Sequence, residues 1–257
     1  MPFEPEPLFP SPLPARKPAL LLTLLLAGSA LVQLAVFWRG VQRARSLAAQ
    51  GRRFERRVAS QGLAVLILGD STGVGVGASE PEESIAGLLA ADHPDADIAN
   101  ISESGARIAD AVAQARRCNE AGLRFDVAIL HVGGNDIVRA TPAAKLVDDC
   151  EALMKELRSL ARRIVWLGPP NLGTAPLFPA PYSWVLGSRS RAVTAIFARS
   201  ARRHDVSFVD FSAPAHATHF SRRRRQHFAV DGFHPSSSSY RYGYTAARRA
   251  LGLAPEG

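Results

Sequence analysis

Short apolar runs alternate with amphipathic stretches along most of the chain from residue 62 onward. The first run, residues 63–68, is uninterrupted and predicts a strand that is buried on both faces. Further apolar runs predict strands at residues 97–101, 125–130, 164–167 and 206–209. The stretches between these runs predict helices at residues 82–91, 106–121, 142–160, 188–203 and 236–251.

This alternation predicts an α/β fold with a five-stranded parallel sheet, because each parallel crossover needs a helix to return the chain. Helices then cover both faces of the sheet, and the carboxyl ends of the strands share one edge, where such folds place their functional sites. One helix start carries a local signal. Thr141 is predicted as the N-cap of the helix at residues 142–160, with Pro142 in the first helical position.

The N-terminal part of the chain has a different pattern. Residues 1–18 are rich in proline and predict an extended, disordered tail. Residues 19–38 carry no charge, and twenty helical residues span roughly 30 Å, the thickness of the hydrocarbon core of a membrane. They predict a transmembrane or membrane-associated helix, followed by a basic linker helix at residues 39–61 and a globular domain at residues 62–257. A cleaved signal peptide and a helix lying on the membrane surface are the alternatives.

The net charge of +8 is concentrated beside this apolar segment. Residues 1–59 hold nine Lys or Arg against three acidic residues, whereas residues 60–257 hold 22 against 20. A nearly neutral domain without interleaved aromatic and basic side chains does not favour a nucleic acid partner. Seven arginines follow the apolar segment and two basic residues precede it, so the positive-inside rule predicts a cytoplasmic domain, with export as the alternative.

Polar residues follow three of the predicted strands and precede the last helix. They form four blocks: GDS at residues 69–71, NISESG at 100–105, GGND at 133–136 and DGFHP at 231–235. Because the strands are predicted to be parallel, the first three blocks lie at the same edge of the sheet.

In type and in order, these blocks resemble those of the SGNH (GDSL-type) hydrolase family, over roughly residues 62–251. The resemblance implies a three-layer, flavodoxin-like fold and a serine esterase, thioesterase or lysophospholipase that uses no cofactor. It assigns the nucleophile to Ser71 and the acid and base to Asp231 and His234. It assigns the oxyanion hole to the backbone amides of Ser71 and Gly105 and to the side chain of Asn135. The sequence has no G-x-S-x-G elbow, which argues against an α/β-hydrolase.

The chemistry of these residue types agrees with the assignment. A serine hydroxyl needs a base within hydrogen-bond reach, and the near-neutral pKa of histidine suits His234 to that role. Asp231 lies three residues earlier and can reach the other ring nitrogen, which fixes the tautomer. A glycine at position 105 leaves room for its backbone amide to approach a developing oxyanion.

The sequence indicates less about the substrate than about the catalytic residues. Residues 168–187 predict a long, Pro-rich loop after the fourth strand, and long loops are often functional. Its Leu172, Phe178 and Trp184 are candidate substrate-binding residues that either line an acyl site or pack over the sheet edge. The expected substrate is a small acyl ester or a lipid-like ester. An acyltransferase using the same serine and a non-catalytic, membrane-tethered binding module are the alternative functions.

The other histidines predict no metal site. His216, His219, His227 and His234 have no cysteine beside them and do not match a zinc spacing. His131, at the end of the third strand, is predicted to be a buried, hydrogen-bonded residue without a catalytic role.

Overall fold

The computed structural model describes residues 16–58, 62–222 and 224–253. The chain divides into two compact units, Met1–Arg39 and Gly40–Gly257. The predicted tail lies outside the described residues as far as residue 15. Its last three positions already belong to the first helix, α1 (Arg16–Gln50), which therefore begins earlier than predicted.

Helix α1 contains the uncharged stretch of the sequence. Among the described residues, Leu22–Gln50 is the one helical segment that is long and apolar enough to cross a membrane. Length and composition are the only criteria for this statement, and a signal sequence near an N-terminus meets them equally well.

The basic segment after the apolar stretch is helical over only part of its predicted length. Helix α1 ends at Gln50, whereas the linker helix was predicted over residues 39–61. Arg56 forms an antiparallel bridge with Ile98 on the outermost strand of the sheet. The Arg56 guanidinium also donates hydrogen bonds to the carbonyls of Ala90 and Ala96. This pairing with an otherwise open strand edge satisfies backbone groups that a continued helix would leave exposed there.

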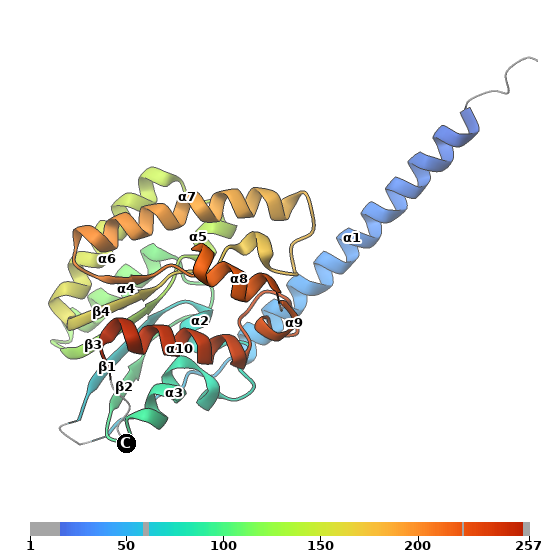
Figure 1. Ribbon diagram of the computed structural model, residues 1–257. Coiled ribbons are helices and arrows are strands. Elements are labelled where there is room, and N and C mark those ends of the chain that lie inside the picture. Colours follow the sequence, from blue (N-terminus) through green and yellow to red (C-terminus); the bar gives the residue numbers. More distant parts are fainter. Residues whose placement is uncertain (1–15, 59–61, 223, 254–257) are drawn as a thin grey trace, which may run out of the picture. The chain divides into compact units, whose positions relative to one another are not determined.

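The globular unit contains the predicted five-stranded parallel sheet (Figure 1). Its spatial order is β2-β1-β3-β4-β5, and every pairing is parallel. This is the flavodoxin-like order, and the fold prediction is confirmed. The strands are β1 (Ala64–Gly69), β2 (Asp97–Asn100), β3 (Phe125–His131), β4 (Ala161–Leu167) and β5 (Ser207–Val209).

Helices cover both faces of this sheet. On one face lie α3 (Ile85–Asp92) and α10 (Ser237–Leu251), and on the other lie α4 (Ile108–Glu120), α6 (Ala143–Leu160) and α7 (Tyr182–Arg203). Both faces of β1 are therefore in the core, and Val65, Leu66, Ile67 and Leu68 are all fully buried. The short helical elements are α2 (Ser71–Val74), η1 (Pro81–Glu83), α5 (Gly134–Val138), η2 (Leu172–Thr174), α8 (Pro214–Arg222) and α9 (Arg224–His227).

Two local predictions are wrong. Helix α7 begins at Tyr182 instead of residue 188, so part of the predicted loop after β4 is helical. Thr141 is not the N-cap of α6, because its hydroxyl donates a hydrogen bond to Asp136 at 2.8 Å. Pro142 occupies the cap position instead.

Candidate active site

Ser71 lies at a sharp turn between β1 and α2. Gly69, the last residue of β1, has a φ of +133°, and a Cβ atom there would lie 1.7 Å from the carbonyl oxygen of His131. Only glycine fits this close approach of two strands. Asp70 then caps α2 by accepting a hydrogen bond from the Thr72 amide at 2.8 Å, which places Ser71 in the first position of the helix.

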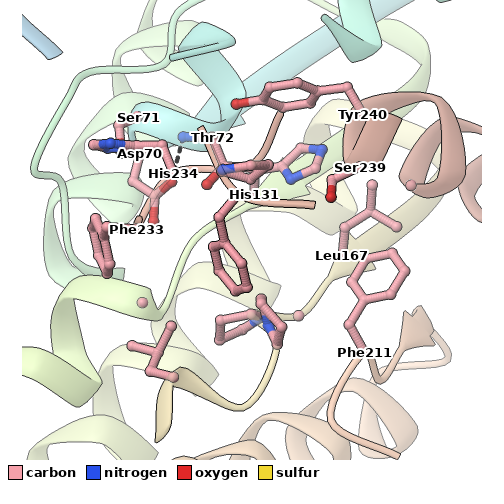
Figure 2. A pocket seen from close by; sticks show the side chains of 18 of the residues that line it. Asp70, Ser71, Thr72, His131, Leu167, Phe211, Phe233, His234, Ser239 and Tyr240 are labelled. Atoms are coloured by element: carbon pink, nitrogen blue, oxygen red, sulfur yellow. Dashed lines mark hydrogen bonds between the residues drawn. The ribbon is translucent and has the colours of Figure 1, made fainter. Parts of the chain in front are cut away.

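His234 connects Ser71 to Asp231 (Figure 2). Its Nε2 is 3.0 Å from the hydroxyl of Ser71, and its Nδ1 is 2.5 Å from Oδ2 of Asp231. All three side chains are buried. Because an ionised carboxylate only accepts hydrogen bonds, Nδ1 carries the proton, and Nε2 is left to accept the proton of the serine hydroxyl.

Backbone amides that follow Asp231 in the sequence hold its carboxylate in place. Its Oδ1 accepts hydrogen bonds from the amides of Phe233 and His234, at 2.9 and 3.0 Å. Burial alone would raise the pKa of the Asp231 carboxyl, but the hydrogen bond and charge of His234, together with these amides, lower it below its ordinary value. The carboxylate is therefore ionised at neutral pH and orients the imidazole.

Three groups are available to donate hydrogen bonds to an oxyanion: the side-chain amide of Asn135 and the backbone amides of Gly105 and Ser71. The Asn135 amide donates to the carbonyl of Ala106 at 3.0 Å, which fixes its orientation and leaves its second hydrogen for another acceptor. Gly105 has a φ of +86°, a conformation that favours glycine. Within the described part of the chain, the backbone amides of Ser71 and Gly105 donate no hydrogen bond.

A model of the GDSL-like lipase/acylhydrolase family matches residues 67–242, more than half of the sequence. The chain belongs to this family. The family was therefore identified correctly from the four sequence blocks, and membership makes the protein a hydrolase of ester bonds.

Solved structures agree with the GDSL-like fold. An acetyl xylan esterase from Geobacillus stearothermophilus has 22% sequence identity and a TM-score of 0.56, over 75% of this chain and 95% of that chain. An α/β-hydrolase enzyme, LAE5, from the metagenome of Lake Arreo in Spain has 19% identity and a TM-score of 0.59, over 75% and 96%. TesA has 20% identity and a TM-score of 0.58, over 74% and 99%. At these identities the likeness concerns the fold. No curated protein matches the sequence.

Two buried amide side chains of this GDSL-like hydrolase position the loops around Ser71. Gln114 brackets Gly69 by accepting from its N–H at 2.9 Å and donating to its carbonyl at 3.0 Å. Asn100 donates to the carbonyl of Gly73 at 2.9 Å. No pattern in the sequence predicted a role for Gln114. The feature of the sequence that distinguishes Gln114 is its polarity, because it lies on the apolar face of α4, where Ile108, Ala111 and Ala115 are also buried.

Asp136, in the GGND block, serves the structure of the site. One carboxylate oxygen accepts from the Ile108 amide at 2.9 Å, and the other accepts from the Thr141 hydroxyl at 2.8 Å. Burial raises the pKa of this carboxyl. Asp136 thus connects α5, which contains Asn135, to the start of α4 and to Thr141.

The candidate substrate-binding residues lie in three different environments. Leu172 lies on the wall of a cavity that also contains Ser71 and His234. Phe178 is buried, with its ring 5.7 Å from that of Phe233, which lines the same cavity. Trp184 is 72% exposed and is not on the cavity wall. Their roles in binding substrate stay predictions.

The other histidines form no metal-binding group among the residues whose placement is described. His216 is hydrogen-bonded to the Tyr242 hydroxyl at 2.6 Å. The side chain of His219 lies outside the description. His131 corrects one prediction: it is buried, but its Nε2 has no hydrogen-bond partner within the described residues.

Asp70 should make folding stability depend on pH. Burial is the main influence on its carboxyl and raises its pKa to about 6, from 3.8 in an unfolded chain. Between these values the folded protein retains a proton that the unfolded chain releases, so stability falls as the pH rises through about 6. The shift corresponds to roughly 3 kcal/mol. The Asp70→Asn variant keeps the cap without this titration.

Urea unfolding at several pH values tests this expectation. The free energy of unfolding of Asp70→Asn, relative to wild type, should rise by roughly 2.5 kcal/mol between pH 4 and pH 7.5. Using the difference between the two proteins cancels the titration of other groups. A difference that stays constant over this range contradicts the argument.

Proposed function

We propose that the protein is a serine hydrolase that cleaves carboxylic ester or thioester bonds of acyl substrates through an acyl-serine intermediate. One observation carries the proposal: the Ser71 hydroxyl is 3.0 Å from His234 Nε2, and Nδ1 of the same ring is 2.5 Å from Asp231. A serine is a weak nucleophile unless a base accepts its proton as it attacks, and this geometry supplies the base.

The proposed reaction has two halves. Ser71 Oγ attacks the acyl carbonyl while His234 takes its proton, and Asp231 stabilises the resulting imidazolium. The amides of Ser71 and Gly105 and the side chain of Asn135 stabilise the negative charge on the carbonyl oxygen. His234 then returns the proton to the departing alcohol or thiol. In the second half, water attacks the acyl-serine with His234 again as the base.

The acetyl xylan esterase from Geobacillus stearothermophilus supports the roles of Asp231 and His234. Two structures of that enzyme are of catalytic mutants, in which an aspartate and a histidine three positions apart are each replaced by alanine. Asp231 and His234 have the same spacing.

We also propose that α1 is an uncleaved membrane anchor and that the catalytic domain lies in the cytoplasm, where a lipid-like acyl ester is within reach. Support comes from the apolar length of α1 and from the arginines that follow it. In sealed inside-out vesicles, added protease should degrade the catalytic domain. Protection of the domain would place it on the opposite side of the membrane.

Labelling with a fluorophosphonate tests the proposed nucleophile. The reagent phosphonylates serines that an adjacent base activates, so peptide mapping should find the adduct on Ser71. Labelling should disappear in Ser71→Ala and persist in Ser84→Ala, which removes a buried serine that caps α3. If wild type is unlabelled at concentrations that label a control serine hydrolase, the non-catalytic binding module becomes the better explanation.

A further inference from the structure

The last residues of α1 and those that follow it contact both backbone segments that carry the proposed oxyanion amides. One segment is α2, which begins at Ser71, and the other is the loop at residues 101–106, here called the oxyanion loop because it contains Gly105. The contacting residues, 48–53, belong to the globular unit and are called the α1 end. They precede residues 67–242, which the family model matches, so family membership assigns them no role.

The α1 end packs closely against α2. A Cβ atom on Gly51 would lie 2.8 Å from Cγ2 of Val76 and 3.2 Å from Cγ1 of Val74. Both valines are buried, and Val74 is the last residue of α2. The backbone at Gly51 therefore lies directly on the short helix whose first residue is the proposed nucleophile.

The oxyanion loop is attached to the sheet only in its first part. The Glu103 amide donates to the carbonyl of Gly69 at 3.0 Å. Among the described residues, the next two backbone amides, those of Ser104 and Gly105, donate no hydrogen bond. A free amide is what an oxyanion donor requires, but its orientation then depends on contacts that its neighbours make.

The α1 end supplies two of these contacts. Arg53 Nη1 donates to the carbonyl of Ser102 at 3.1 Å. The Ser104 hydroxyl donates to the carbonyl of Ala48 at 3.4 Å, which is long for a hydroxyl donor. The bond from Arg53 is charge-assisted and is the stronger of the two.

An ion pair between Glu103 and Arg117, at 2.8 Å, also contacts the oxyanion loop. Its two side chains are 56% and 57% exposed, and exposed ion pairs contribute little. The acceptor of the Arg53 bond belongs to Ser102, which is only 1% exposed, so this bond is shielded from water at one end. Arg53 is therefore the main side-chain support of the loop on this side.

We infer that the α1 end positions the proposed oxyanion hole, and that Arg53 is the positioning residue that holds the oxyanion loop through the carbonyl of Ser102. The inference rests on the proposed acyl-serine function and extends it, because it makes the segment after the apolar stretch necessary for full turnover. Oxyanion donors lower the barrier only when they are fixed in place before the negative charge develops. Loss of Arg53 should therefore act on kcat.

The Arg53→Met variant tests the inference, because it keeps most of the hydrocarbon stem and removes the guanidinium. With a short-chain p-nitrophenyl ester, kcat should fall about tenfold, less than the roughly 10²- to 10³-fold that loss of a whole donor costs. KM should change by less than about twofold, since substrate binding is not altered. The Arg53 side chain is 42% exposed, so the variant should stay folded, which near-UV circular dichroism measures.

Two controls separate this bond from the other interactions of the basic segment. Glu55→Gln removes the ion pair of Arg53 with Glu55, at 3.2 Å, and leaves the bond to Ser102. Arg57→Met removes a neighbouring guanidinium, which pairs with Asp97 at the end of β2 opposite to the oxyanion loop. Both variants should keep the wild-type kcat.

The remaining outcomes contradict the inference. A folded Arg53→Met variant whose kcat equals that of the controls, or in which only KM rises, overturns it. Loss of the fold in Arg53→Met also overturns it, because the residue would then support the whole domain instead of the loop. In each of these cases an active wild type leaves the proposed function intact, whereas a wild type that hydrolyses no ester rejects both.

Discussion

Replacing Ser71 with alanine should lower kcat/KM for a short-chain p-nitrophenyl ester by about 10⁴-fold or more, while the protein stays folded. The hydroxyl is the only group that the substitution removes, and its interaction in the structure is with His234 at 3.0 Å. Without it, His234 has no nucleophile to activate, and water would have to attack the ester directly. Initial rates at several ester concentrations measure the loss of kcat/KM. Near-UV circular dichroism measures whether the variant stays folded.

Ser84→Ala is the matched control for this experiment. Ser84 is also a buried serine at the start of a helix, where its hydroxyl accepts from the Gly87 amide at 3.2 Å and donates to the carbonyl of Pro81. The variant should lose about 1 kcal/mol of stability from the weakened cap and hydrolyse the ester at nearly the wild-type rate. Near-full activity in Ser71→Ala would reject the assignment of the nucleophile.

The sheet and the placement of the four polar blocks could be predicted because both depend on local patterns. An uninterrupted apolar run such as residues 63–68 is compatible with few structures other than a strand covered on both faces. Once the strands are parallel, Ser71, Gly105 and Asn135 must follow strands that end at one edge. His234 reaches the same edge because its block lies just before α10, and its distance from Ser71 follows from tertiary packing that no local pattern records.

Features that depend on contacts between distant segments were not predictable. The sequence around Arg56 is basic and helix-compatible, yet the free edge of β2 pairs with it through Ile98. Gln114 has the position of a core residue in its helix, and its partner Gly69 is 45 residues away. Both interactions satisfy buried backbone groups, a requirement that arises only after the chain has folded.

The cavity illustrates the same limit for substrate recognition. Leu172 could be proposed from sequence as part of an apolar wall, because it follows β4 beside the predicted site. Ile85 and Phe211 could not, since one comes from α3 and the other follows β5, and only the packing of α10 over the sheet brings them to one space. His131 was expected to be hydrogen-bonded, because most buried polar groups are, and its Nε2 is an exception within the described residues.

Asn135→Ala should lower kcat by about 10²- to 10³-fold with a much smaller change in KM. The amide of Asn135 is already oriented by its 3.0 Å hydrogen bond to the carbonyl of Ala106, so its contribution is greatest where negative charge develops, in the transition state. Asn119→Ala is the matched control, because the Asn119 amide likewise donates to a backbone carbonyl, that of Glu156 at 3.1 Å, and is not on the cavity wall. Loss of that bond, and of the Asn119 hydrogen bonds with Glu156 Oε2 and the Ser159 hydroxyl, should reduce stability by roughly 1–3 kcal/mol and leave kcat unchanged. Steady-state kinetics with a p-nitrophenyl ester separates the two constants. An Asn135→Ala variant in which only KM rises would mean that the side chain binds substrate and transition state equally, and that the backbone amides of Ser71 and Gly105 carry the oxyanion alone.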